Sequence, residues 1–322
     1  MKEVTFLRKN KDKWKKFDSL LIFREKKSPD ELADLFIHIT DDLSYSKTFY
    51  PESTTTQYLN SLAARVHQTI YRTKKESKGR FKQFWGTELP LLMFKYRKNL
   101  LISFIIFCTS ILIGIISSAN DDNFVRLILG DSYVNMTLEN IKEDDPLAVY
   151  KKMNQVDMFL GITFNNIRVS FLAFTFGIFF SFGTGLMLFY NGVMLGSFQY
   201  LFYQHNLLWE SILVVWIHGT LEISAIIIAG CGGLILGNSI IFPRTYSRRV
   251  SFMRGAKDGL KIIVGLIPIF ILAGFLESFV TRYTDMPLFI SLFIIIGSLL
   301  FVIWYFIIFP KIIYKRKINA ED

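Results

Sequence analysis

A histidine and a glutamate lie four positions apart in the apolar run "WIHGTLEISAIIIAGCGGLILG", residues 216–237. An α-helix turns about 100° per residue, so His218 and Glu222 share one face, about 40° apart. A charged side chain at the bilayer centre costs about 2.5–3.5 kcal/mol even on insertion scales, so Glu222 needs a polar partner inside the protein. Together the two groups could relay protons or ions, or bind the headgroup of a lipid or solute.

Amide side chains supply further polar groups for the same site. Continued helical geometry places Asn166 and Asn191 on one stripe, and Asn165 directly precedes Asn166. We expect His218, Glu222 and these three asparagines to form an intramembrane polar site. A structural alternative stays open, in which the same groups form a polar clamp that fixes helix register.

Catalysis and metal binding are not expected from this pattern. One His and one Glu supply only two ligands, and their spacing differs from the HExxH motif of metalloproteases. We therefore expect no enzyme activity, no metal and no cofactor.

Small residues recur at about every fourth position on both polar stripes, which lets two helix backbones approach closely within lipid. We expect these two helices to pack face to face, with the polar groups in the seam. Gly230 and Gly232, beside Gly233, broaden the small surface and suggest a homodimer. The expected packing positions are Gly219, Ala225, Ala229, Gly233, Gly237, Ala173, Gly177, Ser181, Gly185, Gly192 and Gly196.

The chain as a whole has the composition of a membrane protein, because 51% of its residues are hydrophobic and they gather in runs. A sixth run, 192–204, is shorter than the roughly 20 residues of a straight crossing, so we expect a half-helix, a re-entrant segment or a tilted span there. The predicted fold class is all-α, a polytopic membrane protein with about six passages. The five long runs are 99–119, 169–190, 207–240, 262–280 and 288–309.

Charge predicts the orientation, because Lys and Arg collect in cytoplasmic segments. Residues 2–98 carry 21 Lys/Arg against 12 Asp/Glu, whereas residues 120–165 carry four against eight. Keeping the basic segments on one side requires an even number of passages, with both termini cytoplasmic. This topology and attraction to the lipid bilayer explain the formal net charge of +10, so nucleic-acid binding is not expected. The N-terminus shows no removable signal peptide.

Five segments follow from these patterns. Residues 1–79 are predicted to form a cytoplasmic helical bundle, because apolar residues recur there at helical spacing. Residues 80–98 mix aromatic and basic residues, as an interfacial amphipathic helix does. Residues 99–317 form the transmembrane domain. Within it, 120–165 is an extracytoplasmic segment with a possible docking face, and 244–261 is a basic cytoplasmic loop.

The segment "FNNIRVSFLAFTFGIFFSFGTGLMLFYNGVMLG" and the later "HGTLEISAIIIAGCGGLILG" resemble the stage II sporulation protein M family of bacterial and archaeal integral membrane proteins. The resemblance implies a non-enzymatic scaffold or partner subunit of a peptidoglycan-remodelling complex of the cell envelope, in the cytoplasmic membrane. It also implies membrane or envelope protein partners, among them an AAA-type ATPase on the cytoplasmic side. The alternative is a transporter, channel or permease-like subunit that uses the His/Glu/Asn site.

Overall fold

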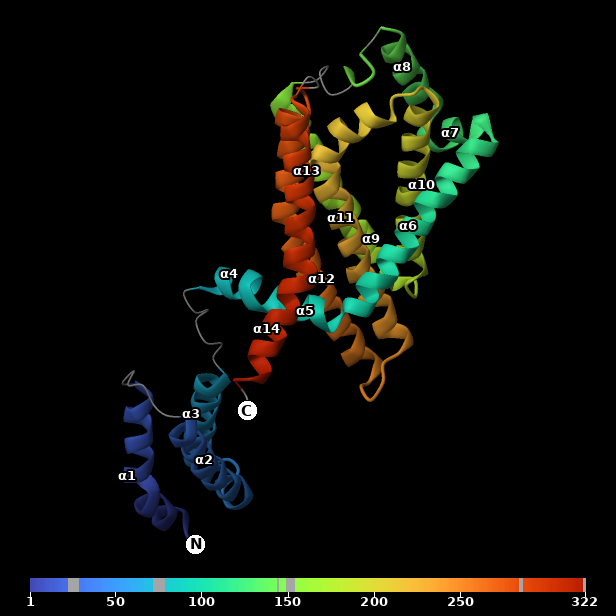
Figure 1. The fold of residues 1–322 in the computed structure, drawn as a ribbon. Helices are drawn as coiled ribbons and strands as arrows, with labels where there is room; N and C mark the ends of the chain where they lie inside the picture. The colour runs from blue at the N-terminus through green and yellow to red at the C-terminus, as the bar shows by residue number, and fades with distance from the viewer. Residues whose placement is uncertain (23–28, 72–78, 144, 149–153, 284–285, 321–322) are drawn as a thin grey trace. The chain divides into compact units, whose positions relative to one another are not determined.

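The computed structural model describes residues 1–22, 29–71, 79–143, 145–148, 154–283 and 286–320. Every regular element among these residues is a helix, as Figure 1 shows. The chain divides into two compact units, Met1–Arg80 and Phe81–Asp322.

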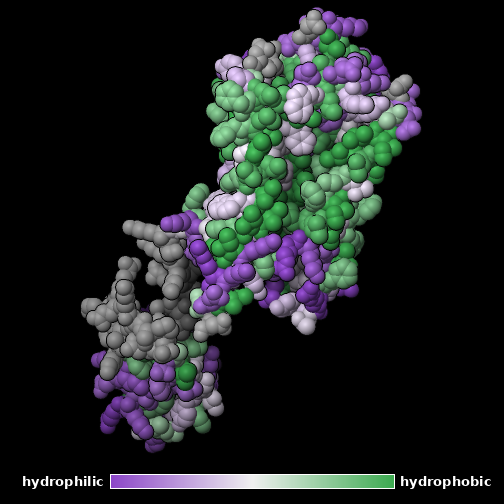
Figure 2. All heavy atoms as spheres, viewed as in Figure 1, coloured by the Kyte–Doolittle hydropathy of each residue, from purple (hydrophilic) through white to green (hydrophobic). Residues whose placement is uncertain are grey.

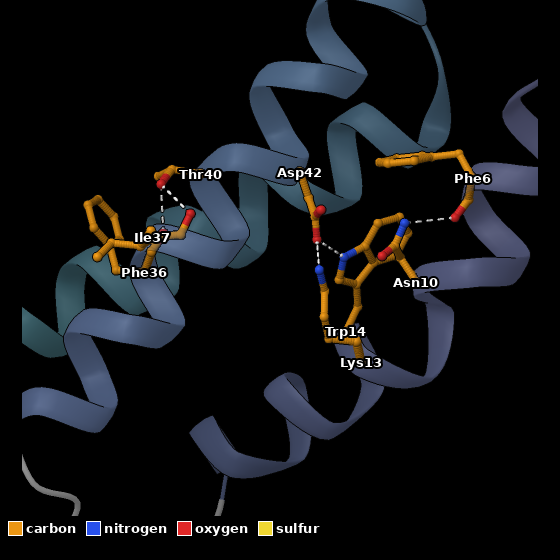
Figure 3. A network of polar contacts seen from close by, with 8 residues as sticks. All are labelled: Phe6, Asn10, Lys13, Trp14, Phe36, Ile37, Thr40 and Asp42. Atoms are coloured by element: carbon orange, nitrogen blue, oxygen red, sulfur yellow. Dashed lines mark hydrogen bonds and ion pairs between the residues drawn. The ribbon is translucent and has the colours of Figure 1, made fainter. Parts of the chain in front are cut away.

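The first unit contains three helices with a hydrophobic core of their own. These are α1 (Glu3–Ile22), α2 (Pro29–Phe49) and α3 (Thr54–Tyr71). Trp14 of α1 is buried in this core, and its indole Nε1 donates a hydrogen bond to Asp42 Oδ2 at 2.8 Å. Lys13 pairs with the same carboxylate at 2.5 Å (Figure 3). The core residues are Phe6, Trp14, Leu35, Ile39, Leu43, Leu59, Leu62, Ala63 and Val66.

Five helices of the second unit are long and apolar enough to cross a membrane, counted over the described residues. Figure 2 shows the matching hydrophobic belt, with hydrophilic residues gathered at its two ends. The spans are α6 (Arg97–Asn120), α9 with its 3₁₀ extension η3 (Gln155–Ile178), α11 (Leu208–Ile241), α12 with the π-helical η4 (Arg248–Val280), and α13, η5 and α14 (Leu288–Ile318).

The predicted run 169–190 is not one helix, and this part of the prediction was wrong. Helix α9 ends at Thr175, η3 covers Phe176–Ile178, and α10 (Phe182–Gln204) begins after a reversal of the chain. Phe180 and Ser181 have left-handed backbone, with φ of 53° and 67°. A contact with α11 helps to hold this turn, because Ser181 Oγ lies 3.3 Å from Asn238 Oδ1.

The reversal also changes the prediction for 192–204. This segment is the second half of α10, whose 23 residues reach about 35 Å at 1.5 Å per residue. It is therefore part of a full-length helix rather than a half-helix, and α10 packs against α6.

Residues 80–95 form one unbroken helical run, and the chain bends at Tyr96 into α6; we call residues 80–96 the elbow. It consists of α4 (Arg80–Gln83), the π-helical η1 (Phe84–Glu88) and α5 (Leu89–Lys95). Its apolar residues Leu89 and Met93 are buried in the transmembrane core, and Glu88 pairs with Lys261 of α12 at 2.8 Å. Asp258 of α12 accepts hydrogen bonds from Lys95 Nζ and Tyr96 Oη, each at 2.7 Å. Burial raises the pKa of the Tyr96 phenol.

The predicted basic loop 244–261 is mostly helical, because α12 (Arg248–Phe275) begins at its fifth residue. At the opposite end of the unit, α7 (Asp122–Leu129) and α8 (Asp131–Lys142) connect α6 to α9 (Figure 1). Residues 144 and 149–153 of this connection lie outside the described residues. Leu147 is buried against Phe202 and Val214, so this connection packs on the ends of α10 and α11.

Candidate functional site

Helix α11 is the central helix of the transmembrane unit and contacts α6, α9, α10, α12 and α13. It buries His218, which is 4% exposed, and holds Glu222 one turn further along. His218 is buried and Glu222 is half-buried between the helices of the unit.

The structure brings a second carboxylate to this pair, from a residue that sequence reasoning did not single out. Glu277 lies in η4 (Leu276–Val280), the π-helical turn that follows α12. Its Oε1 is 3.8 Å from His218 Nε2. One ligand atom from each of His218, Glu222 and Glu277 can be chosen so that all three lie within 4.8 Å of one another. The available signal was a lone acid inside the apolar run 262–280, which is uncommon without a function.

The imidazole of His218 is held in one orientation. Its Nδ1 lies 3.0 Å from Oγ1 of Thr281, a fully buried residue at the end of η4. Nε2 therefore faces Glu277. With Nδ1 protonated and donating to the hydroxyl oxygen, Nε2 would be the unprotonated ring nitrogen, because the hydrogen bond of one ring nitrogen selects the tautomer.

Asn166 of α9 reaches the site from the opposite side. It is 6% exposed and neighbours the Glu222 carboxylate, yet its Nδ2 makes no hydrogen bond of normal geometry among the described residues. Asn165, also expected in the site, is exposed on the other face of α9. Only one of the two adjacent asparagines therefore points inward.

A cavity of about 330 Å³ opens beside the cluster, and His218, Glu222 and Asn191 all line it. Asn191 belongs to α10, so it reaches the cavity from a different helix than Asn166, and its Nδ2 donates to Met187 O at 2.7 Å. Tyr133 of α8 also lines the cavity. Burial is the main cause that raises the pKa of the Tyr133 phenol, and the nearby Glu277 carboxylate adds to it.

The small residues place the helices around this site. A Cβ on Gly177 would overlap with Gly233 O, and one on Gly237 would overlap with Ser181, so α11 contacts the α9–α10 hairpin backbone to backbone. Ala173, Ala225 and Ala229 are buried. Gly192 and Gly196 instead contact α6, whereas Gly185 and Gly219 meet nothing closer than 3.7 Å.

The three glycines that suggested a homodimer are used within the chain. Gly230 faces Ser103 and Leu188, and Gly232 faces α12 at Gly259. Gly233 meets Thr184 and Ala173.

The fold and site together define an all-α polytopic membrane protein with ionisable residues clustered between its helices. The family model for stage II sporulation protein M matches residues 103–282, and the chain belongs to that family. A second family model, for a domain of unknown function (DUF8413), matches residues 4–72. No curated protein and no solved structure matched the chain.

Proposed function

We propose that this chain is a non-enzymatic membrane subunit that joins partner proteins on the two sides of a bacterial or archaeal cytoplasmic membrane, within a cell-envelope assembly. One observation carries the proposal. The unit Met1–Arg80 has its own hydrophobic core and its own family match, separate from the match to the transmembrane unit. A separately folded helical unit on a membrane anchor is suited to binding a partner outside the bilayer.

The orientation follows from the charge rule. Counting α10 with the five apolar spans gives six passages, which returns both termini to one side. The 21 Lys/Arg of residues 2–98 favour the cytoplasm for that side. Helices α7 and α8 then lie on the outer face, where Leu127 is 77% exposed and available to an envelope partner.

The test is recovery of a defined partner. The full chain and residues 81–322 are each purified from membranes after co-expression with an AAA-type ATPase from the same organism. We expect the ATPase to be recovered with the full chain and lost without residues 1–80. The full chain with Glu222→Gln serves as the control. If the N-terminal unit binds the ATPase, this variant should recover as much ATPase as the wild type. Equal recovery with and without residues 1–80 would refute this partner.

The cavity favours a second candidate function, a permease-like subunit that moves a proton or small solute. Backbone and polar groups at membrane depth are tolerated where they line a cavity, and this one is lined by His218, Glu222 and Asn191. The full chain in proteoliposomes would then show pH-dependent flux that Glu222→Gln abolishes at unchanged thermal stability. Absence of flux in the wild type would exclude this function.

A further inference from the structure

We propose that His218, Glu222 and Glu277, completed by the side chain of Asn166, bind one divalent cation of the zinc class. The inference goes beyond the scaffold proposal and does not require it. Zinc is commonly held by a mixture of imidazole nitrogen and carboxylate oxygen, and the sequence alone offered only two such ligands. The third comes from η4, 55 positions after Glu222 along the chain.

The ligand atoms of His218, Glu222 and Glu277 lie close enough together to bind a small ion. The three ligand atoms lie within 4.8 Å of one another. Zinc bonds of about 2.0–2.2 Å in tetrahedral geometry place ligand atoms about 3.3–3.6 Å apart. The ligands therefore need to approach by about 1 Å, which small side-chain rotations of two glutamates supply.

The charge of the two carboxylates also favours a bound cation. Glu222 and Glu277 are close enough to repel each other, and both lie inside helices of the membrane-spanning unit. Two ionised carboxylates there require compensation, because buried like charges are strongly unfavourable. A neutral His218 supplies no positive charge, whereas one divalent cation balances both carboxylates.

The surroundings of His218 match those of a metal-bound imidazole. Such a residue usually donates its second ring N–H to a neighbouring acceptor, which fixes the tautomer and aims the free nitrogen at the metal. Thr281 Oγ1 occupies this position at 3.0 Å from Nδ1, and Nε2 is directed to Glu277.

Asn166 of α9 supplies a fourth polar side chain beside the cluster. The residue is 6% exposed and its side chain interacts with the Glu222 carboxylate, but its Nδ2 forms no hydrogen bond of ordinary geometry among the described residues. The oxygen and nitrogen of a carboxamide exchange places on rotation, so Oδ1 can be turned into the cluster. With that oxygen as the fourth ligand, the donor set becomes one nitrogen and three oxygens. The adjoining cavity gives an ion a route to Glu222 and His218.

The test measures metal on the purified full chain in detergent. The protein is stripped with a chelator, incubated with ZnCl2, freed of excess metal and analysed for zinc by mass spectrometry. We expect about one zinc per chain. Substitution by Co2+ should produce the visible absorption of a four-coordinate site. Glu277→Gln should weaken zinc binding by about 100-fold or more, since even the loss of an outer-shell partner costs 10–100-fold. Glu210→Gln is the matched control on α11, because Glu210 is exposed.

Two further variants keep the proposal falsifiable if Glu277→Gln fails to fold. Thr281→Val keeps the shape but removes the oxygen beside Nδ1, and should weaken zinc binding by about 10–100-fold. Asn166→Ala should also weaken it, while Asn165→Ala, on the exposed face of the same helix, should not. A wild-type protein that takes up no zinc would overturn the proposal and leave two carboxylates that share a proton. Unchanged zinc affinity in folded Glu277→Gln, Thr281→Val or Asn166→Ala would overturn it as well. These measurements need no flux or partner, so their failure is distinct from failure of either proposed function.

Discussion

Gly233→Ala tests whether close backbone contact between α11 and the α9–α10 hairpin holds the transmembrane unit together. A Cβ at this position would overlap with Thr184 Oγ1 and lie 2.5 Å from Ala173 O. Overpacking of this kind costs about 1–3 kcal/mol. Thr184 Oγ1 also donates to Ala173 O at 2.7 Å, and loss of that bond adds about 0.5–1.5 kcal/mol. The better helix propensity of Ala returns about 1 kcal/mol, so the net destabilisation should be about 1–3 kcal/mol.

The assay is the thermal stability of the purified full chain in detergent, followed by size-exclusion chromatography after heating. Gly219→Ala is the matched control on the same helix, because its Cβ would meet nothing closer than 3.7 Å. We expect Gly219→Ala to equal or exceed the wild type in stability, and Gly233→Ala to lose its native peak at lower temperature. Equal melting of the two variants would refute the packing argument.

Three further predictions concern other parts of the molecule. Phe180→Gly should raise thermal stability by relieving about 1 kcal/mol of left-handed strain at φ 53°, whereas Phe189→Gly inside α10 should lower it. In residues 1–80 expressed alone, hydrogen bonds from Ser53 and Thr55 lower the pKa of Glu3, so its stabilising contribution is present above pH 4.5, the ordinary pKa, and is lost in acid. Urea unfolding measured across that pH range should show that acid lowers the free energy of unfolding less in Glu3→Gln than in the wild type. Asp258→Asn should destabilise the elbow by about 1–2 kcal/mol, measured as faster proteolysis before α5.

Much of the architecture could be predicted because helical periodicity is a local property of the sequence. The spacing along α11 predicted which of its faces meets other helices, and there the structure buries His218 and the small residues, with Glu222 half-buried beside them. The reversal at Phe180–Ser181 could not be predicted in the same way. The turn lacks Pro or Asn, and it depends on the contact between Ser181 and Asn238, 57 positions away.

The site was predictable only to the extent that its members share a helix. His218 and Glu222 are neighbours on α11, whereas Glu277 joins them through the packing of α12 against α11. Of the two adjacent asparagines that we expected in the site, only Asn166 faces it, for a related reason. Adjacent helical residues point about 100° apart, so Asn166 could face the site only if Asn165 did not.

Because of the π-helical turn at Leu276–Val280, a one-residue deletion could disrupt the cluster of His218, Glu222 and Glu277 while leaving the rest of the fold in place. Such a turn is equivalent to one residue inserted into an ordinary helix. Loss of a single codon within it would restore regular α-helix and rotate the residues on one side by about 100° relative to the other. Relatives could thus retain the transmembrane unit while Glu277 and Thr281 no longer both face His218, so the ionic cluster can be gained or lost in one evolutionary step.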